Sequence, residues 1–300
     1  MLVEGPKVAL VERVLLLRAC PLLKNLGLFE LARMAEHMRS RRFASEAILL
    51  RPGVPLSVLV FMREGHADVM SSAAEPRRVG PRDTLGDLAD LFHDAAAPTV
   101  VARSPVLTLE LERSDLEDLL EDEFSIYHGV LRALAQRLVQ QRVLRGEAAP
   151  KTGEPMRYEH HDLDLVERIL MLRRTAAFAG ADVEALAELA ELATPLVLPP
   201  RSVLWSAGAA SDHFLVPVSG RILASTARRS KAFGPGSTLG LFESLSGAAR
   251  WFDAVAATEA RALRVPTSAL VDLAEDNFAL GMTLLRATAR AARGSDTSAT

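Results

Sequence analysis

Hydrophobic and polar positions follow the same succession of patterns twice along the chain. Each half opens with helical periodicity: in "VERVLLLR" (11–18), Val11, Leu15 and Arg18 fall on successive turns of one amphipathic helix. The pattern predicts a second helix after it in each half, at 28–38 and at 183–192. Both halves therefore begin with a predicted helical pair.

Short segments of period two come next, with proline and glycine between them. This pattern predicts an antiparallel sandwich or barrel, with Gly53 and Gly65 at hairpin turns. In the first half the alternating segments are "AILLRPG" (47–53), "VLVFMREGHADVM" (58–70) and "TVVARSPVLTLELE" (99–112).

Helical periodicity returns at the end of each half. In the first half, Ser114 is a suitable N-cap for "DLEDLLEDE". A longer helix is predicted over 126–145, where Leu131, Leu134 and Leu138 form one stripe. That stripe is an interface candidate because its spacing resembles a short coiled-coil seam, although packing on its own sheet would explain it equally.

The two halves are related by an internal repeat. "VERVLLLR" (11–18) and "VERILMLR" (166–173) are identical at six of eight positions. The same offset of 155 residues places Gly53 on Gly208 and Gly65 on Gly220. We therefore expect two domains of one fold, at 8–146 and 164–293, with a linker at 147–163 and a disordered tail at 294–300.

Composition narrows the classes of function. The chain has 300 residues and a net charge of −3, so no global field favours nucleic acid or a membrane surface. Its single cysteine, Cys20, excludes an internal disulfide and fits a core thiol in a reducing compartment. The charged N-terminus is not a signal peptide, and no apolar run is long enough to span a bilayer. A cytoplasmic protein is expected, and its arginine-rich, lysine-poor composition suggests a GC-rich bacterial source.

The pattern of glycines and strands resembles the cyclic nucleotide-binding domain family, found in catabolite-activator-type regulators and in protein-kinase regulatory subunits. The segments that carry the resemblance are "FASEAILLRPG" (43–53), "VFMREGHADV" (60–69), "LGDLADL" (85–91) and "TVVA" (99–102), with "LPPRSVLWSAG" (198–208) and "FLVPVSGRIL" (214–223) in the second half. The resemblance covers most of the chain. It implies a mainly β fold with flanking helices: two tandem jelly-roll (double-stranded β-helix) domains.

In that family, a short cassette after a glycine holds the cyclic phosphate. The resemblance implies three contributions: backbone amides for the phosphate, a glutamate directly after the glycine for the ribose hydroxyl, and an arginine nine residues later for the phosphate. In the first half these positions are Gly86, Asp87 with Leu88, and Ala96 with Ala97. Aspartate keeps the charge on a shorter side chain, but the arginine is missing.

The second half departs from the family pattern at the other position. Gly240 is followed by Leu241 and Phe242, so the acid is missing, whereas the arginine is present as Arg250. Arg250 is predicted either to hold an anion or to pair with Glu243 or Asp253 as a structural group. The large neighbours Trp251 and Phe252 either fill the pocket or cap an apolar ligand. Each half therefore keeps one member of the polar pair, and not the same member.

Other candidate sites are weaker. "YEHHDLD" (158–164) groups His160, His161 and Asp162 as possible metal ligands, but it lies in the predicted linker, where Asp162 or Asp164 can simply cap a helix. "ARRSKAF" (227–233) resembles a basophilic kinase site at Ser230, yet a hairpin turn explains it better. The sequence contains no motif of a phosphate-binding loop, a serine hydrolase or a zinc protease, and we expect neither an enzyme nor a metal. The few residues after the second domain leave no room for a DNA-reading module.

The sequence thus predicts a non-catalytic regulatory or interaction protein that binds cAMP and cGMP poorly and needs no cofactor. Its partner would be another protein or a second copy, contacted through the closing helices. The alternative is a small-ligand sensor in which Asp87 or Arg250 selects a cyclic nucleotide or another anion and signals to a protein partner.

Overall fold

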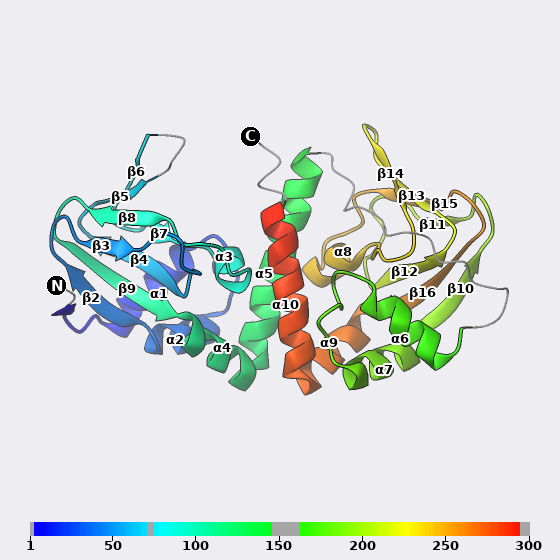
Figure 1. The fold of residues 1–300 in the computed structure, drawn as a ribbon, viewed down its shortest axis with the longest axis horizontal. Coiled ribbons are helices and arrows are strands. Elements are labelled where there is room, and N and C mark those ends of the chain that lie inside the picture. The colour runs from blue at the N-terminus through cyan, green and yellow to red at the C-terminus, as the bar shows by residue number, and fades with distance from the viewer. Residues whose placement is uncertain (1–2, 71–74, 146–162, 295–300) are drawn as a thin grey trace. The chain divides into compact units, whose positions relative to one another are not determined.

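A computed structural model describes residues 3–70, 75–145 and 163–294 (Figure 1). The chain divides into two compact units, Met1–Ala133 and Leu134–Thr300, and the division lies within helix α5 (Phe124–Arg145). The predicted linker and tail lie outside the described residues, except for Leu163 and Gly294.

The first unit packs two antiparallel sheets with strand orders β1-β2-β9-β4-β7 and β3-β8-β5-β6 (Figure 1). Its strands are β1 (Val3–Glu4), β2 (Arg39–Phe43), β3 (Ile48–Leu50), β4 (Val58–Glu64), β5 (Ala67–Met70), β6 (Arg77–Val79), β7 (Thr84–Leu85), β8 (Thr99–Ala102) and β9 (Val106–Glu112). Its helices are α1 (Leu10–Ala19), α2 (Leu28–Glu36), α3 (Leu88–Phe92), α4 (Arg113–Asp122) and the first part of α5.

The second unit contains sheets of order β10-β16-β12 and β11-β15-β13-β14. Its strands are β10 (Thr194–Leu198), β11 (Val203–Trp205), β12 (His213–Ser219), β13 (Ile222–Ser225), β14 (Ser230–Phe233), β15 (Asp253–Ala256) and β16 (Ala260–Pro266). Its helices are the second part of α5, α6 (Leu165–Arg173), α7 (Val183–Leu192), α8 (Leu241–Ser246), α9 (Thr267–Asp276) and α10 (Phe278–Gly294).

Corresponding strands pair in the same way in both units, so the predicted duplication into two jelly rolls is confirmed at the level of topology. The β2-β9-β4 order matches β10-β16-β12, and β3-β8-β5-β6 matches β11-β15-β13-β14. Even the irregularities repeat: the register shifts between Met62 and Glu64 on β4 and between Pro217 and Ser219 on β12. A bulge bends a strand and fixes its register, so its repetition at one offset shows that both halves fold alike.

The glycine turns differ from the sequence prediction. Gly53 and Gly65 both adopt positive φ, but each joins strands that belong to opposite sheets, so neither closes a hairpin. Gly65 is required for a second reason, since a Cβ there would lie 2.2 Å from the carbonyl oxygen of Pro105. The alternating pattern marks strands and turns but carries no information on which sheet a strand joins.

The predicted helix ends are correct for α6 but not for α4 and α5. Asp164 caps α6 in a capping box with Glu167, one of the two alternatives left open at that site. Ser114 does not cap α4, because the helix begins one residue earlier and its N-cap is Glu112, with no side-chain cap. The closing helix begins at Phe124, two residues before the predicted start.

The repeated "VERxLxLR" segments owe part of their identity to a shared structural role. Arg13 donates to the carbonyl oxygens of Val8, Ala35 and Met38, which ties α1 to the end of α2. Arg168 donates to the corresponding oxygens of Leu163 and Ala193. A buried leucine, Leu17 or Leu172, faces the core in each copy. In the described part of the chain, no helix is long and apolar enough to cross a bilayer.

Candidate functional site

The cassette of the first unit starts at a left-handed glycine. Gly86 has φ +82°, and a Cβ there would come within 2.8 Å of the Leu56 side chain. Leu56 is buried, and its N–H donates to the carbonyl oxygen of Ala95 at 2.8 Å. The segment before β4 is thus fastened to the segment after α3, and Leu56 packs directly on the cassette glycine.

Asp87 uses its carboxylate inside the cassette. It is the N-cap of α3, and its Oδ1 accepts from the N–H of Ala89 at 2.9 Å. Leu88, the next residue, is fully buried. This carboxylate satisfies one of the free amides at the start of the helix, which is the ordinary role of an N-cap aspartate.

The position of the absent arginine is part of the backbone pairing. Ala96 forms an isolated bridge with Pro55, and the N–H of Ala97 donates to the carbonyl oxygen of Val54 at 2.8 Å. Ala96 is exposed, whereas Ala97 is buried. This segment is linked to Gly86 through Leu56, and no cationic side chain stands at position 96.

The cassette of the second unit has the same backbone. Gly240 has φ +84° and caps α8, which begins at Leu241. A Cβ on Gly240 would lie 2.1 Å from Nη1 of Arg250, so here the arginine occupies the space that Leu56 approaches in the first unit. The two cassette loops are thus alike in backbone and unlike in the groups that surround them.

Arg250 points into the domain. Its side chain is buried at 1% exposure, and it donates to the carbonyl oxygens of Gly240, at 3.0 Å, and His213. The guanidinium lies 4.1 Å from the ring centroid of Trp205, in a cation–π arrangement. Burial lowers the pKa of Arg250, while Glu243 and Asp212 act in the opposite direction. Among the described residues it forms no ion pair with either predicted partner, Glu243 or Asp253.

Aromatic side chains fill the space beside Arg250. Phe252 is buried and packs edge-on against Trp205 and Trp251, with ring centroids 5.8 and 5.3 Å apart. Trp251 Nε1 donates to Glu243 Oε1 at 2.8 Å, so the acid that could have balanced Arg250 is held by the indole. Glu243 is itself buried. Of the two alternatives for these aromatics, the geometry corresponds to filling.

The second part of α5 completes this filled site. The Arg142 guanidinium lies 4.9 Å from the ring centroid of Phe242, and Gln136 Nε2 donates to the carbonyl oxygen of Ser246 at 3.2 Å. The cavity left among Arg142, Phe233, Leu239, Gly240, Phe242 and Trp251 has a volume of about 10 Å³. That space holds about one water molecule, whereas pockets for small ligands usually measure roughly 300–1,000 Å³.

Sequence reasoning missed three residues of this site. Trp205 on β11 and His213 on β12 contact Arg250, and neither was among the predicted site residues. Arg142 lies in the closing helix, which the sequence assigned to the first domain. No local motif marks any of them, because each reaches the site through the tertiary fold.

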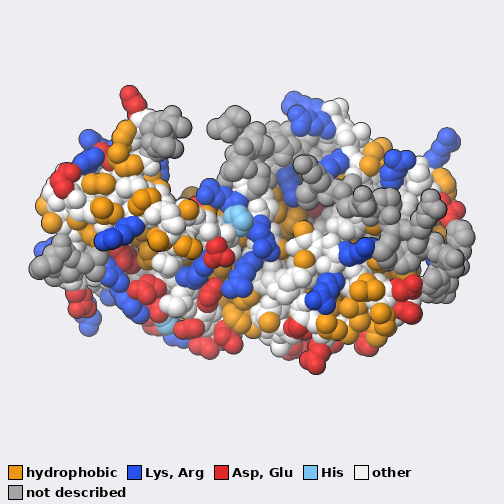
Figure 2. All heavy atoms as spheres, viewed as in Figure 1, with side chains coloured by type: hydrophobic (Ala, Val, Ile, Leu, Met, Phe, Trp, Pro, Cys, Tyr) orange, Lys and Arg blue, Asp and Glu red, His pale blue; other side chains and the backbone are white. Residues whose placement is uncertain are grey.

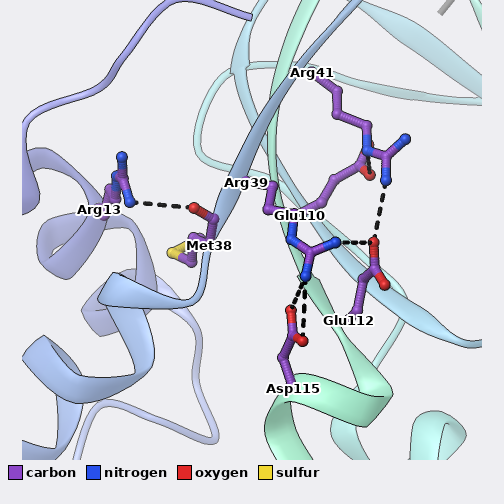
Figure 3. Close-up of polar contacts among 7 residues, drawn as sticks. All are labelled: Arg13, Met38, Arg39, Arg41, Glu110, Glu112 and Asp115. Carbon is purple, nitrogen blue, oxygen red and sulfur yellow. Dashed lines mark hydrogen bonds and ion pairs between the residues drawn. The ribbon is translucent and has the colours of Figure 1, made fainter. Parts of the chain in front are cut away.

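A second polar cluster lies on β2, β9 and the start of α4 in the first unit (Figure 3). Arg41 forms an ion pair with Glu110 at 2.8 Å and Arg39 with Asp115 at 3.1 Å, and both arginines also reach Glu112. Glu110 is buried, which raises its pKa, while Arg41 opposes the shift. These contacts join β2, β9 and α4. Every member of the cluster is already paired, so it is a structural network.

The equivalent positions of the second unit carry no such network. The strand register equates Arg41 with Leu196 and Arg39 with Thr194. The charged network therefore belongs to one copy only. On the face drawn in Figure 2, acidic and basic side chains are interspersed over the first unit rather than gathered into one field.

The remaining predicted sites fall as follows. Leu131, Leu134 and Leu138 are all buried within the chain, so the stripe does not form an exposed seam. Ser230 begins β14 and the turn before it is the expected hairpin, while Cys20 is buried and forms no disulfide. His160, His161 and Asp162 lie outside the described residues, within which no three His, Cys, Asp or Glu side chains group as metal ligands.

Comparison with known proteins finds a match to a known domain family in the second unit. Residues 195–277 match the cyclic nucleotide-binding domain family. A curated relative, the Pycsar effector protein PaPycTIR of Pseudomonas aeruginosa, is 29% identical over 138 residues, covering 46% of this chain and 44% of the relative. The chain thus spans less than half the length of that relative.

Two solved structures are similar at low sequence identity. The regulatory domain of Toxoplasma gondii PKA, crystallised with cAMP, is 17% identical, and the match covers 92% of this chain and 96% of that chain at a TM-score of 0.37. The N-terminal domain of a transcriptional regulator from Streptomyces coelicolor A3(2) is 24% identical, and the match covers 43% and 97% at a TM-score of 0.39.

The family match falls on the unit whose cassette contains Gly240 and Arg250, and the other unit repeats its strand order. Residues 195–277 are therefore similar to the cyclic nucleotide-binding domain family, and the first unit is a second jelly roll with the same strand order.

Proposed function

We propose that this protein is a non-catalytic, cytoplasmic regulatory protein whose two domains serve protein interaction and bind cAMP and cGMP poorly. One observation carries the proposal: Arg250, the only member of the usual polar pair in the second cassette, donates from Nη1 and Nη2 to two backbone carbonyl oxygens beside a cavity of about 10 Å³. A nucleotide would have to break both hydrogen bonds and displace the aromatic filling before it could bind.

The first cassette supports the same conclusion for a different reason. Asp87 already accepts a hydrogen bond from Ala89, and Ala96 offers no charge to a phosphate. The loss of one partner of a desolvated charged pair costs about 2–5 kcal/mol, roughly thirtyfold to a few thousandfold in affinity. We therefore expect weak binding at both sites.

Calorimetry of the full chain with cAMP and with cGMP tests the proposal. We expect no dissociation constant below the micromolar range at either site. The double substitution Ala96→Arg with Asp87→Glu should raise affinity at the first site, and Ala96→Leu with Asp87→Glu is the matched control, which lacks only the charge. A submicromolar dissociation constant for the unmodified chain would contradict the proposal.

The partner would contact the exposed side of the closing helices α5 and α10. Because the leucine stripe is buried, the available side of α5 is the one that carries Val143, which is about half exposed. Val143→Glu should weaken such an interface without unfolding the chain. Light scattering at high micromolar concentration tests self-association; a monomer under these conditions would leave only a foreign partner for these helices.

A small-ligand sensor is the second candidate, and the retained cassette backbone favours it. Gly86 and Gly240 keep the same left-handed conformation, with φ +82° and +84°, although the side chains around them differ. A thermal-shift screen with cyclic mono- and dinucleotides would detect such a ligand, since binding at about 100 times the dissociation constant adds about 2.7 kcal/mol of stability. No shift with any of these nucleotides would remove this candidate for that ligand class.

A further inference from the structure

The outer face of α1 presents an apolar pair that the core does not use. Val11 and Leu15, four residues apart and therefore on one face of the helix, are 70% and 61% exposed. The stripe that the sequence predicts is thus real, but these two members point to solvent while Leu17 faces the core.

The second copy keeps the same two residues in the same state. Val166 and Leu170 on α6 correspond to Val11 and Leu15, and they are 63% and 49% exposed. Packing accounts for two of the other identities of the repeat, because Arg13 and Leu17 have structural roles that Arg168 and Leu172 share. It does not account for an exposed valine and leucine.

A hollow of about 530 Å³ lies beside Leu15 in the first unit, between α1, β4 and the turn that joins β6 to β7. Its apolar lining comes from Leu15, Leu16 and Ala19, and three basic side chains, Arg18, Arg63 and Arg82, stand around it. Arg63 is paired with Glu12 of α1 at 3.0 Å. Within the described part of the chain, Arg18 and Arg82 have no carboxylate partner. The lining therefore carries a positive surplus beside apolar surface.

Arg82 occupies a costly backbone position. Its φ is +77°, a conformation that residues other than glycine rarely adopt, and the corresponding turn of the second unit has Gly236 with φ +82°. The second unit also has the buried Val218 in place of Arg63. The first unit thus places an exposed guanidinium at a turn for which the second unit uses glycine.

We propose that this hollow, defined by Leu15, Leu16, Ala19, Arg18, Arg63 and Arg82, docks an acidic amphipathic helix of a partner protein. An apolar ridge at positions i and i+4 packs into the groove of a facing helix, and the surplus positive charge selects acidic residues on its flanks. The surface uses no residue of either cassette, so the proposal stands whether or not a cassette binds a nucleotide.

The probe is a labelled synthetic helix with leucines at positions i, i+3, i+4 and i+7 and glutamates between them, titrated with the full chain by fluorescence anisotropy. A peptide with lysine in place of every glutamate is the charge control. We expect saturable binding of the acidic peptide, at least about tenfold tighter than the basic one and weaker in high salt.

Three variants locate the binding surface. Leu15→Glu should weaken binding about tenfold or more, because it removes the apolar anchor. Arg82→Gly should weaken it about threefold, while relief of the positive φ keeps the fold at least as stable. Leu170→Glu, the matched change in the second copy, should leave affinity within about twofold because Val218 and Gly236 stand there in place of Arg63 and Arg82.

Equal affinity for the two peptides, binding unaffected by Leu15→Glu, or no binding of the acidic peptide at millimolar concentration would each overturn the proposal. A Leu15-dependent dimer of the unmodified chain in sedimentation would overturn it in favour of a second copy as the occupant.

Discussion

The two cassettes have the same backbone conformation, but a carboxylate lies beside the first and a guanidinium beside the second. At Gly86 the helix start is satisfied from within, by the carboxylate of Asp87, and Leu56 packs on the glycine. At Gly240 no side chain caps the helix, and Arg250, from the loop between α8 and β15, fills the space instead. Duplication therefore preserved the turn, which depends on glycine, while the side chains that give such a turn its chemistry diverged in different directions.

The difference teaches that a conserved loop geometry is weak evidence for a ligand. A positive-φ glycine before a short helix is required by the strand-to-helix connection itself, whatever lies beside it. Each copy makes different hydrogen bonds at that connection. In the first copy Asp87 accepts from Ala89, and in the second Arg250 donates to the carbonyl oxygen of Gly240. Four experiments sharpen or break this comparison, and they follow in order of expected effect.

The largest effect concerns the fragment boundary. Fragment 134–300 should unfold cooperatively, whereas fragment 164–300 loses Arg142 over Phe242 and the bond from Gln136 to Ser246. The shorter fragment also lacks Leu134 and Leu138, and each buried leucine contributes about 1.5–3 kcal/mol. We expect a loss on the order of 5 kcal/mol, seen in urea unfolding followed by circular dichroism. Equal midpoints would show that the predicted boundary at 164 is sufficient and that α5 is not needed by the second jelly roll.

The next effect is the removal of the buried arginine. Arg250→Ala leaves the carbonyl oxygens of Gly240 and His213 without a donor and opens space beside Trp205, so we expect a loss of about 3–5 kcal/mol. Arg264→Ala is the control, because that side chain is nearly half exposed and should change stability by less than about 0.5 kcal/mol. A small effect of Arg250→Ala in thermal unfolding would mean that Arg250 is available to a ligand after all.

A smaller loss is expected in the first cassette. Asp87→Ala removes the N-cap of α3 and should cost about 1 kcal/mol, while Asp87→Ser keeps an acceptor and should cost a few tenths. Chemical denaturation of both variants measures the difference. If alanine and serine are equally stable, the carboxylate is not serving as a cap, and a ligand role for it gains weight.

The smallest effect is a pH dependence in the second unit. Burial lowers the pKa of His213 below 6.5, and Arg264 and Arg250 lower it further, while Asp212 acts against them. The unfolded chain then binds the proton more readily, so the stability gained from neutral His213 is present above pH 6.5 and is lost as the pH falls toward the folded-state value. Melting temperatures from pH 7.5 to 5.5 should decline, and less steeply in His213→Gln. Parallel profiles for the two proteins would contradict this assignment.

Much of the fold was predictable because it depends on local pattern. The offset between Gly65 and Gly220, the alternating strands and the helical pairs required two copies of one β domain. The difference between the two cassettes was also predictable from the sequence. The first has Asp87 but no arginine, and the second has Arg250 but no acid. The prediction that Gly65 turns a hairpin was wrong, because consecutive strands of a jelly roll cross between sheets and period two does not record that.

Only the tertiary structure decided which groups meet. The sequence left open whether Arg250 binds an anion or a carboxylate. In the fold it donates to two backbone carbonyl oxygens, those of Gly240 at the start of α8 and of His213 on β12. The sequence also left open whether Leu134 and Leu138 form an intermolecular seam or pack within the chain, and both are buried in the structure. Hydrophobic periodicity identifies an apolar stripe on a helix but does not tell which part of the protein covers it. The exposure of Val11 and Leu15 therefore became clear only from the packed structure.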